Sequence, residues 1–361
     1  MQNNHWARLS KELTFSSQIF RHALRAAIAI TLAVAVVKQT SLYHALWVPI
    51  TVLVIMRPSL GGTLHISWKR LAGTVAGAAG GILIAFLELP MAAVGSLAFA
   101  MLFLIFYFKG RNYLAFIAFL TADLVIVLAA AFPHPWQSGA ERMLDTALGI
   151  GIGLGVSFLV WPNFARKNLR QAIGNLIAAQ HSHFGQLRKA YLSDTPDSVH
   201  LLSGRLQARE SLDNCTQKCT DAAIEPGLIS GQRQELLNLV DIFAKLHKTL
   251  IALSSIVANS TGVFKGEILP DFERLMDTIE NQFSQLETYA RTGEASMSPQ
   301  TFNDCFSRFM ARLGSMRMNG EFDRFPLDAR NNSSSFILQI RQIGDGLDQA
   351  YAGLKNIRAP Q

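Results

Sequence analysis

Six long apolar segments occupy the first 162 residues, and short links that carry charged residues separate them. The segments cover residues 23–40, 43–57, 71–89, 91–108, 113–132 and 143–161. A helix that crosses the hydrocarbon core of a bilayer needs about 20 apolar residues. Most of the segments reach or approach this length, and the second, which contains Pro49, is the weakest. Six such runs in succession favour membrane spans over one large buried core.

After Trp161-Pro162 the pattern changes to that of amphipathic helices. In residues 268–290 apolar side chains recur every three or four positions, which is the period of one helix face. Similar runs cover residues 164–192, 201–223, 232–258, 299–315 and 333–356. The predicted fold class is all-α: a six-span membrane domain over residues 1–162, followed by a cytosolic antiparallel helical bundle over residues 163–361.

Charge divides the chain at the same point. Half of its 361 residues are apolar and 16% are charged, with a formal net charge of +7. Residues 1–162 hold 11 Lys and Arg against 5 Asp and Glu, whereas residues 163–361 hold 22 against 21. The first part is therefore apolar with sparse positive charge, and the second has the balance of an ordinary soluble domain.

The positive residues also predict an orientation, because cytoplasmic loops are enriched in Lys and Arg. Only Lys38 and Arg142 fall on one side of the predicted spans. The other side holds Arg8, Lys11, Arg21, Arg25, Arg57, Lys69, Arg70, Lys109, Arg111, Arg166, Lys167 and Arg170. We expect an inner-membrane protein whose amino and carboxyl termini are both cytoplasmic.

Two stretches of the chain are alike. RLAGTVAGAAGG begins at Arg70, and RMLDTALG begins at Arg142. Aligning the two arginines pairs Thr74 with Thr146, and Pro90 with Pro162. This similarity indicates a duplicated unit. Because the unit holds three spans, the second copy is inverted relative to the first, as in many transporters.

The small residues of these stretches predict close helix packing. One stripe is made by Gly73, Gly77 and Gly81, and another by Gly149 and Gly153. Such stripes let helix backbones approach each other in lipid. The glycine stripes could serve helix packing alone, or they could also line the transport path. The sequence leaves both interpretations open.

The arginines are candidates for anion binding. We expect Arg70 and Arg142 to begin their helices on opposite membrane faces, where free N–H groups also attract anions. Arg25, just inside the first span, would add to the positive field on the inner face. The alternative is that these side chains extend to lipid phosphates.

Asp123 lies near the middle of the fifth predicted span. An ionised carboxylate there costs about 2.5–3.5 kcal/mol on insertion scales, and burial favours the protonated form. Asp123 is therefore a candidate for coupling transport to protons. A structural carboxyl group that is hydrogen-bonded to a neighbouring helix is the other interpretation.

The run YHALWVPITVLVIMRPSLGGTLHISWKRLAGTVAGAAGG, together with RMLDTALGIGIGLGVSFLVWP, resembles the fusaric acid resistance family over about residues 20–165. This family includes bacterial aromatic acid exporters and is related to plant aluminium-activated malate transporters. Larger exporters carry the six-span unit twice, whereas this chain carries it once, so the resemblance implies a homodimer. The chain departs from the pattern at Asp145, and the resemblance does not transfer a substrate.

The leading hypothesis is a secondary exporter of organic carboxylic acids, aromatic acids among them. A passive anion channel of the malate type and a membrane-anchored scaffold are the alternatives. The partners expected are a small organic anion, the lipid bilayer and a second copy of the chain, with no nucleic acid.

No catalytic residue, cofactor or metal site is predicted, and we do not expect an enzyme. No Walker-type loop is present, which disfavours an ATP-driven pump. His181 and His183 are two residues apart, on different faces of a helix, so we expect solvated surface histidines rather than metal ligands. Cys215, Cys219 and Cys305 are expected to be reduced thiols.

Overall fold

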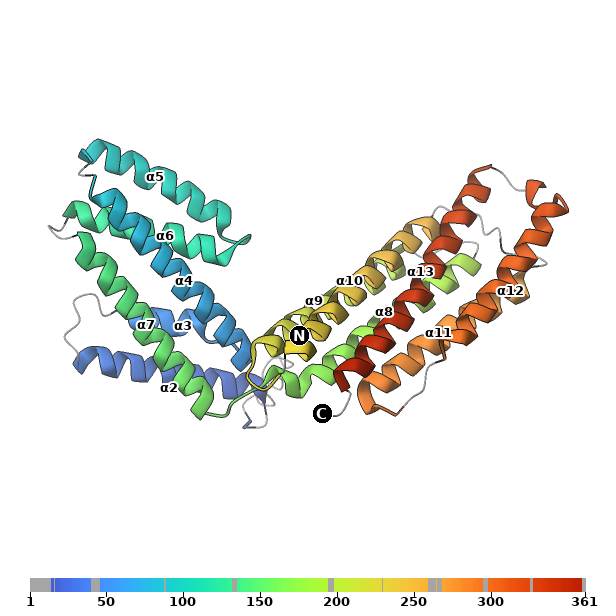
Figure 1. The fold of residues 1–361 in the computed structure, drawn as a ribbon, viewed down its shortest axis with the longest axis horizontal. Coiled ribbons are helices and arrows are strands. Elements are labelled where there is room, and N and C mark those ends of the chain that lie inside the picture. Colours follow the sequence, from blue (N-terminus) through green and yellow to red (C-terminus); the bar gives the residue numbers. More distant parts are fainter. Residues whose placement is uncertain are drawn as a thin grey trace, which may run out of the picture. The chain divides into compact units, whose positions relative to one another are not determined.

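A computed structural model describes residues 14–15, 17–39, 46–87, 89–131, 135–193, 198–228, 230–258, 264, 268–294, 298–324 and 327–358. These residues form twelve α-helices and two short 3₁₀ helices, and none of them lies in a strand (Figure 1). The chain divides into two compact units, residues 1–164 and residues 165–361. The boundary predicted from composition, after Pro162, lies two residues before this division.

The first unit contains six α-helices: α2 (Gln18–Gln39), α3 (Trp47–Ile55), α4 (Leu60–Ala85), α5 (Met91–Phe108), α6 (Tyr113–Ala131) and α7 (Pro135–Leu159). Three described helices are long and apolar enough to cross a membrane, namely α2, α5 and residues 139–159 of α7. In α6 the apolar stretch covers residues 113–129 and is slightly shorter. The nine residues of α3 span only about 13 Å, less than half of a hydrocarbon core.

Helices α2, α4 and α7 of the first unit begin earlier than the apolar pattern predicted, and the difference is largest in α4 and α7. We expected a span over residues 71–89, but α4 begins at Leu60 because the Ser59 hydroxyl accepts a hydrogen bond from the Gly62 N–H at 3.1 Å and caps the helix. We expected the last span to begin at residue 143, but α7 begins at Pro135, in the first helical position that proline favours. Both helices therefore start with a polar stretch that the hydropathy pattern excluded.

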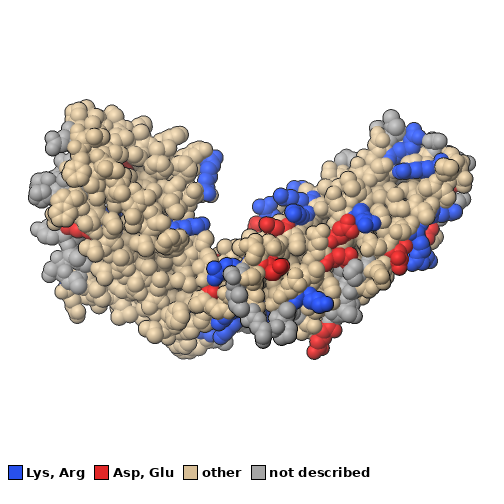
Figure 2. Space-filling model, viewed as in Figure 1, with Lys and Arg blue, Asp and Glu red and all other residues tan. Residues whose placement is uncertain are grey.

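Burial separates inner helices from an outer one in this unit. In α4, eleven residues are buried, whereas α5 buries only Ile105. Phe99, Phe103 and Phe106 of α5 are all more than two-thirds exposed. Aromatic rings on the outside of an apolar helix suit contact with lipid. Figure 2 shows few charged residues on the visible face of this unit.

The second unit begins with the 3₁₀ helix η1 (Ala165–Asn168) and holds a second 3₁₀ helix, η2 (Glu321–Arg324). Its α-helices are α8 (Leu169–Leu192), α9 (Ser198–Ile224), α10 (Ser230–Ala258), α11 (Leu269–Thr292), α12 (Pro299–Met318) and α13 (Leu327–Arg358). Their apolar faces share one core with fully buried aromatic rings, among them Phe184, Phe272 and Phe283. Charges of both signs are interspersed on the visible face (Figure 2). The three cysteines are free thiols in the interior.

Candidate functional site

The glycines of α4 lie directly against α6. A Cβ atom added at Gly73 would lie 2.8 Å from the Leu114 carbonyl oxygen, and one at Gly81 would lie 2.8 Å from the Val125 Cβ. At Gly77 the added atom would overlap the Ala118 carbonyl oxygen. All three distances are shorter than real Cβ atoms allow. The first stripe therefore brings the α4 and α6 backbones together.

The glycines of α7 make a similar contact with α3. An added Cβ at Gly149 would lie 2.6 Å from the Thr51 Cβ, and one at Gly153 would lie 2.7 Å from the Ile55 Cδ1. Gly151 and Gly155, on another face of α7, would meet nothing within 4 Å. The stripe through Gly149 and Gly153 is thus the packed face of this helix.

The two arginines lie inside their helices and not at their starts. Arg70 is the eleventh residue of α4, and Arg142 is the eighth of α7. Their relative exposures are 7% and 5%. The expectation of two basic positions at helix N-termini is wrong, because both helices begin at the earlier residues described above. Burial of both side chains also disfavours the alternative in which they extend to lipid phosphates.

Both arginines instead reach the same short helix. The Arg70 Nη2 donates a hydrogen bond to the Thr51 Oγ1 at 3.2 Å. The Arg142 guanidinium carbon lies 3.7 Å from the ring centroid of Trp47, one turn before Thr51 on α3. The two guanidinium groups are close enough to repel each other. Residues 72 positions apart in the sequence thus contribute to one positively charged region between α3, α4 and α7.

The surroundings of this region are polar and buried. Asp145, one turn after Arg142, is close enough to attract it and is 3% exposed. Thr51, Thr74 and Thr146 are also buried. In the described part of the chain, Asp145 is the one carboxylate that acts on Arg142, beside two guanidinium groups, which leaves a formal surplus of one positive charge there. Neither arginine's Nε has a hydrogen-bond partner among the residues that the structure describes.

The amino end of α3 adds to this positive field. Trp47, the ring under Arg142, is the first residue of α3, and the residue before it, Leu46, supplies no side-chain cap. The first N–H groups of a helix have no partner within the helix and favour anions. The arrangement therefore combines two buried guanidinium groups with a helix N-terminus.

Arg25 has a different role from the one expected. Its Nη2 donates to the carbonyl oxygens of Arg57 and Pro58, each at 2.9 Å, and its Nη1 donates to the Trp161 carbonyl at 3.3 Å. Trp161 adopts φ of 46°, in the left-handed region that disfavours large residues. Arg25 thus joins the α3–α4 link to the end of α7, and its terminal nitrogens are not directed at the region around Arg70 and Arg142.

Asp123 lies on α6 and is partly buried. Its Oδ1 is buried and has no hydrogen-bond partner in the described part of the chain. One turn earlier, Phe119 stacks on Phe108 of α5 with ring centroids 5.4 Å apart. Within the described part of the chain, no hydrogen bond or ion pair joins Asp123 to Arg70 or Arg142.

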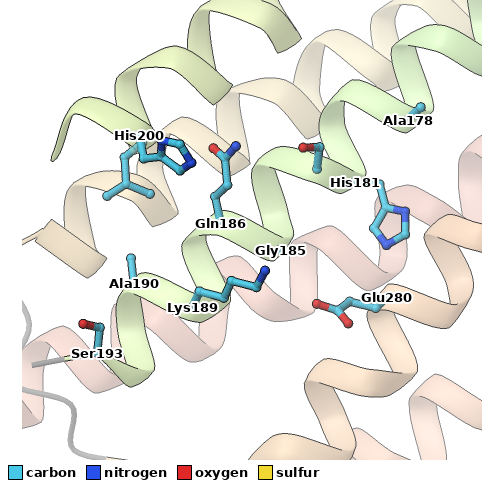
Figure 3. Close-up of a pocket in the computed structure, with 11 residues that line it drawn as sticks. Ala178, His181, Gly185, Gln186, Lys189, Ala190, Ser193, His200 and Glu280 are labelled. Atoms are coloured by element: carbon cyan, nitrogen blue, oxygen red, sulfur yellow. The ribbon is translucent and has the colours of Figure 1, made fainter. Parts of the chain in front are cut away.

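The second unit holds a cavity of about 670 Å³ over α8 (Figure 3). Its floor includes small residues of α8 such as Ala178 and Gly185, and its polar groups include Lys189 and His200. Glu280 of α11 also lines it but forms an ion pair with Arg188 at 2.9 Å. Lys189 and the carboxylate of Glu280 balance each other, so the lining has no clear charge preference.

His181 and His183, which were both expected at the surface, differ in burial in the structure. His181 is half-buried, lines this cavity and stacks on Phe283. His183 is fully buried, so its prediction as a solvated residue is wrong. Burial, with smaller contributions from His247 and Arg205, lowers the pKa of His183 to about 4. The described residues contain no group of three or more potential metal ligands.

Sequence reasoning identified Arg70 and Arg142 but not Trp47 or Thr51. Only the structure shows that α3 supplies the partners of both arginines. A Trp and a Thr in a short apolar run with an internal Pro49 were the available signals, since a broken helix is often found at transporter binding sites.

Residues 28–156 match the sequence model of the fusaric acid resistance protein-like family. This range lies within the first unit, which is therefore similar to that family over most of its length. The match covers the described helices from within α2 to within α7, and so includes Arg70, Arg142 and α3. It confirms the resemblance found in the sequence.

Among curated proteins, the chain is similar to inner membrane protein YccS of Escherichia coli, with 25% identity over 237 residues, which are 65% of this chain and 33% of the relative. Uncharacterized protein ORF2 of Neisseria gonorrhoeae is 21% identical over 224 residues, 62% of this chain and 54% of the relative. Uncharacterized protein slr1298 of Synechocystis is 23% identical over 294 residues, which are 77% of this chain and 38% of the relative. The chain spans between a third and about half of the length of these relatives.

Proposed function

We propose that this membrane protein is an inner-membrane secondary exporter of organic carboxylates, and that Arg70 and Arg142 bind the carboxylate group. The observation that carries the proposal is the pair of buried guanidinium groups at the amino end of α3. Burying an unbalanced charge is costly unless a partner offsets it. A carboxylate matches the fork of a guanidinium group and would supply that partner.

Each residue has a stated part in this proposal. Thr51 orients Arg70 through its hydroxyl group, and the Trp47 ring holds Arg142 by a cation–π contact. Asp145 limits the positive surplus, so that a bound carboxylate is attracted without being held permanently. Release matters because a transporter must let its substrate leave.

The second copy of the chain is part of the proposal as well. The first unit holds one six-helix array, whereas larger exporters of the family that the chain resembles carry the six-span unit twice. We propose a homodimer with its termini in the cytoplasm. Chemical cross-linking of the full chain in native membranes tests the dimer directly, and a monomer under those conditions would contradict it.

The experiment for the carboxylate site uses inside-out vesicles that contain the full chain. Uptake of labelled benzoate and labelled malate is followed with and without an imposed pH gradient. Arg70→Gln and Arg142→Gln remove the charge, and a charge-assisted hydrogen bond contributes about 1.5–3 kcal/mol. We therefore expect uptake at low substrate concentration to fall roughly tenfold or more.

Arg111→Gln is the matched control, because Arg111 is an exposed arginine of the same unit that packs over Tyr107. It should transport like the unmodified protein. If uptake by Arg70→Gln and Arg142→Gln equals that of this control, the carboxylate site is wrong. If uptake of both acids equals that of empty vesicles for every protein, a membrane-anchored scaffold is the better interpretation.

The malate-type channel remains the second candidate. A channel carries its anion only down the gradient, whereas an exporter accumulates it when the pH gradient is imposed. Accumulation of benzoate or malate above equilibrium favours the exporter, and flux that stops at equilibrium favours the channel.

A further inference from the structure

The glycine contacts of the two halves are equivalent. An added Cβ at Gly149 would lie 2.6 Å from the Thr51 Cβ, and one at Gly77 would lie 2.8 Å from the Thr121 Cβ. Gly77 and Gly149 occupy the same place relative to Arg70 and Arg142, seven residues after each. Thr121 on α6 is therefore the counterpart of Thr51 on α3.

A second pair of contacts supports the same register. Gly153 lies against Ile55, and Gly81 lies against Val125, so each contact recurs four residues further along both helices. Thr51 therefore corresponds to Thr121, and Ile55 corresponds to Val125. Sequence alignment related only the glycine-rich stretches, whereas the contacts extend the relationship to α3 and α6.

The arginines break this equivalence. Arg70 bonds Thr51, which belongs to its own half, but Arg142 does not bond Thr121 in the described part of the chain. Arg142 instead lies over Trp47, in the other half. Thr121 is 2% exposed, in the position that corresponds to the partner of Arg70. In the structure both arginines therefore face α3.

We infer that Thr121 is the hydrogen-bond partner of Arg142 in the opposite arrangement, in which both arginines face α6. This inference rests on the proposed transport function, because an inverted pair of halves transports by exchanging their conformations. In the exchanged state Arg142 donates to Thr121 and Arg70 leaves Thr51. A hydrogen bond that forms in one state alone shifts the population toward that state.

The test uses two substitutions that remove only a hydroxyl group, Thr51→Val and Thr121→Val, in the full chain. The reporter is Ser67→Cys, one turn before Arg70 on α4, with the three native cysteines replaced by serine. Ser67 is 3% exposed in the described arrangement, so labelling by a thiol reagent reports departure from it. Gly110→Cys, in the exposed α5–α6 link, gives the labelling rate of a thiol that is accessible in both arrangements.

Thr51→Val weakens the described arrangement and should raise the labelling rate of Ser67→Cys by at least threefold relative to Gly110→Cys. Thr121→Val weakens the opposite arrangement and should lower that rate by a similar factor. Thr121→Ser keeps the hydroxyl and should label like the parent. The inference is overturned if the labelling rate changes in the same direction in both valine variants. It is also overturned if Thr121→Val labels at the same rate as the parent.

Poor folding is recognised separately, because a misfolded variant would expose the thiol and label faster in either case. Thr121→Val is expected to label more slowly, which misfolding cannot produce. The assay needs no substrate, so it also separates the two proposals. If the two valine variants shift the labelling rate in opposite directions but no carboxylate flux is measured, this inference is supported and the proposed substrate is wrong. Arginine-dependent flux with no effect of Thr121→Val would refute this inference alone.

Discussion

The guanidinium group of Arg142 stacks 3.7 Å from the ring centroid of Trp47, and the two residues come from helices α7 and α3. This cation–π contact holds the guanidinium group over the face of the ring. A lysine would keep the charge but could neither stack in this way nor offer two parallel donors. The geometry of the group, and not only its charge, should therefore matter for binding.

Arg142→Lys tests this point. We expect the substrate concentration for half-maximal benzoate uptake to rise about tenfold, since a bidentate pair is replaced by a single donor. Trp47→Phe, which keeps a ring face, should change it much less. Uptake by Arg142→Lys that matches the unmodified protein would show that only the positive charge is used.

The glycine contacts give a prediction with a control on the same helix. Gly77→Ala places a methyl group on the Ala118 carbonyl and should destabilise the first unit by about 1–3 kcal/mol. Gly80→Ala meets nothing within 4 Å and should be neutral or slightly stabilising. Thermal unfolding of the full chain in detergent measures both. Equal unfolding temperatures for the two variants would mean that α4 and α6 are further apart than described.

The orientation predicted from Lys and Arg can be tested at exposed positions. Gly110 lies in the α5–α6 link between two basic residues, and Gln137 lies in the first turn of α7. With the native cysteines removed, an impermeant thiol reagent applied to intact cells should modify Gln137→Cys and spare Gly110→Cys. The reverse pattern would place both termini outside the cytoplasm.

Several elements followed from the sequence because their ends are marked. Residues 91–108 agree with α5 at both ends, since Pro90 precedes the helix and Lys109 follows it. The start of α4 was missed because His65 and Lys69 lower the local hydropathy, although Ser59 after Pro58 is a capping signal. Helix limits are local properties, and local signals can reveal them.

The candidate site depends on packing that no local signal determines. The repeated motif identified Arg70 and Arg142, but it placed them on opposite membrane faces. Their meeting on α3 follows from the way Gly149 brings α7 against Thr51, a contact between residues 98 positions apart. Arg25 was misassigned for the same reason, since its three carbonyl partners lie 32 to 136 residues away.

The buried His183 predicts an acid-sensitive second unit. Burial, the nearby His247 and Arg205 together lower the pKa of His183 to about 4, from 6.5 for a free histidine. The unfolded chain therefore binds a proton more readily than the folded one between these values, so folding stability falls as the pH falls through this range. The loss reaches about 3 kcal/mol at most.

His183→Leu removes this titration. We expect the unfolding temperature of the second unit to fall less between pH 7 and pH 4.5 in the variant than in the unmodified protein. Circular dichroism of the full chain records the helices of both units, and the part of the pH dependence that His183→Leu removes belongs to the second unit. The same pH dependence in both proteins would show that other groups, such as His247, control acid unfolding.

Asp123→Asn tests the proposal that transport is driven by protons. Its Oδ1 is buried in α6 without a described partner, so an ionised carboxylate there would be poorly stabilised. Protonation removes that charge, and a proton that enters as a carboxylate leaves would couple the two movements.

Asp123→Asn keeps the shape and the hydrogen-bonding capacity of the protonated group but cannot exchange a proton. We expect this variant to lose pH-driven accumulation of benzoate while exchange of labelled for unlabelled benzoate continues. Thr121→Ser, two residues earlier on the same helix, should retain both activities. Accumulation that persists in Asp123→Asn would assign Asp123 a structural role, and the proton would have to be carried by another group.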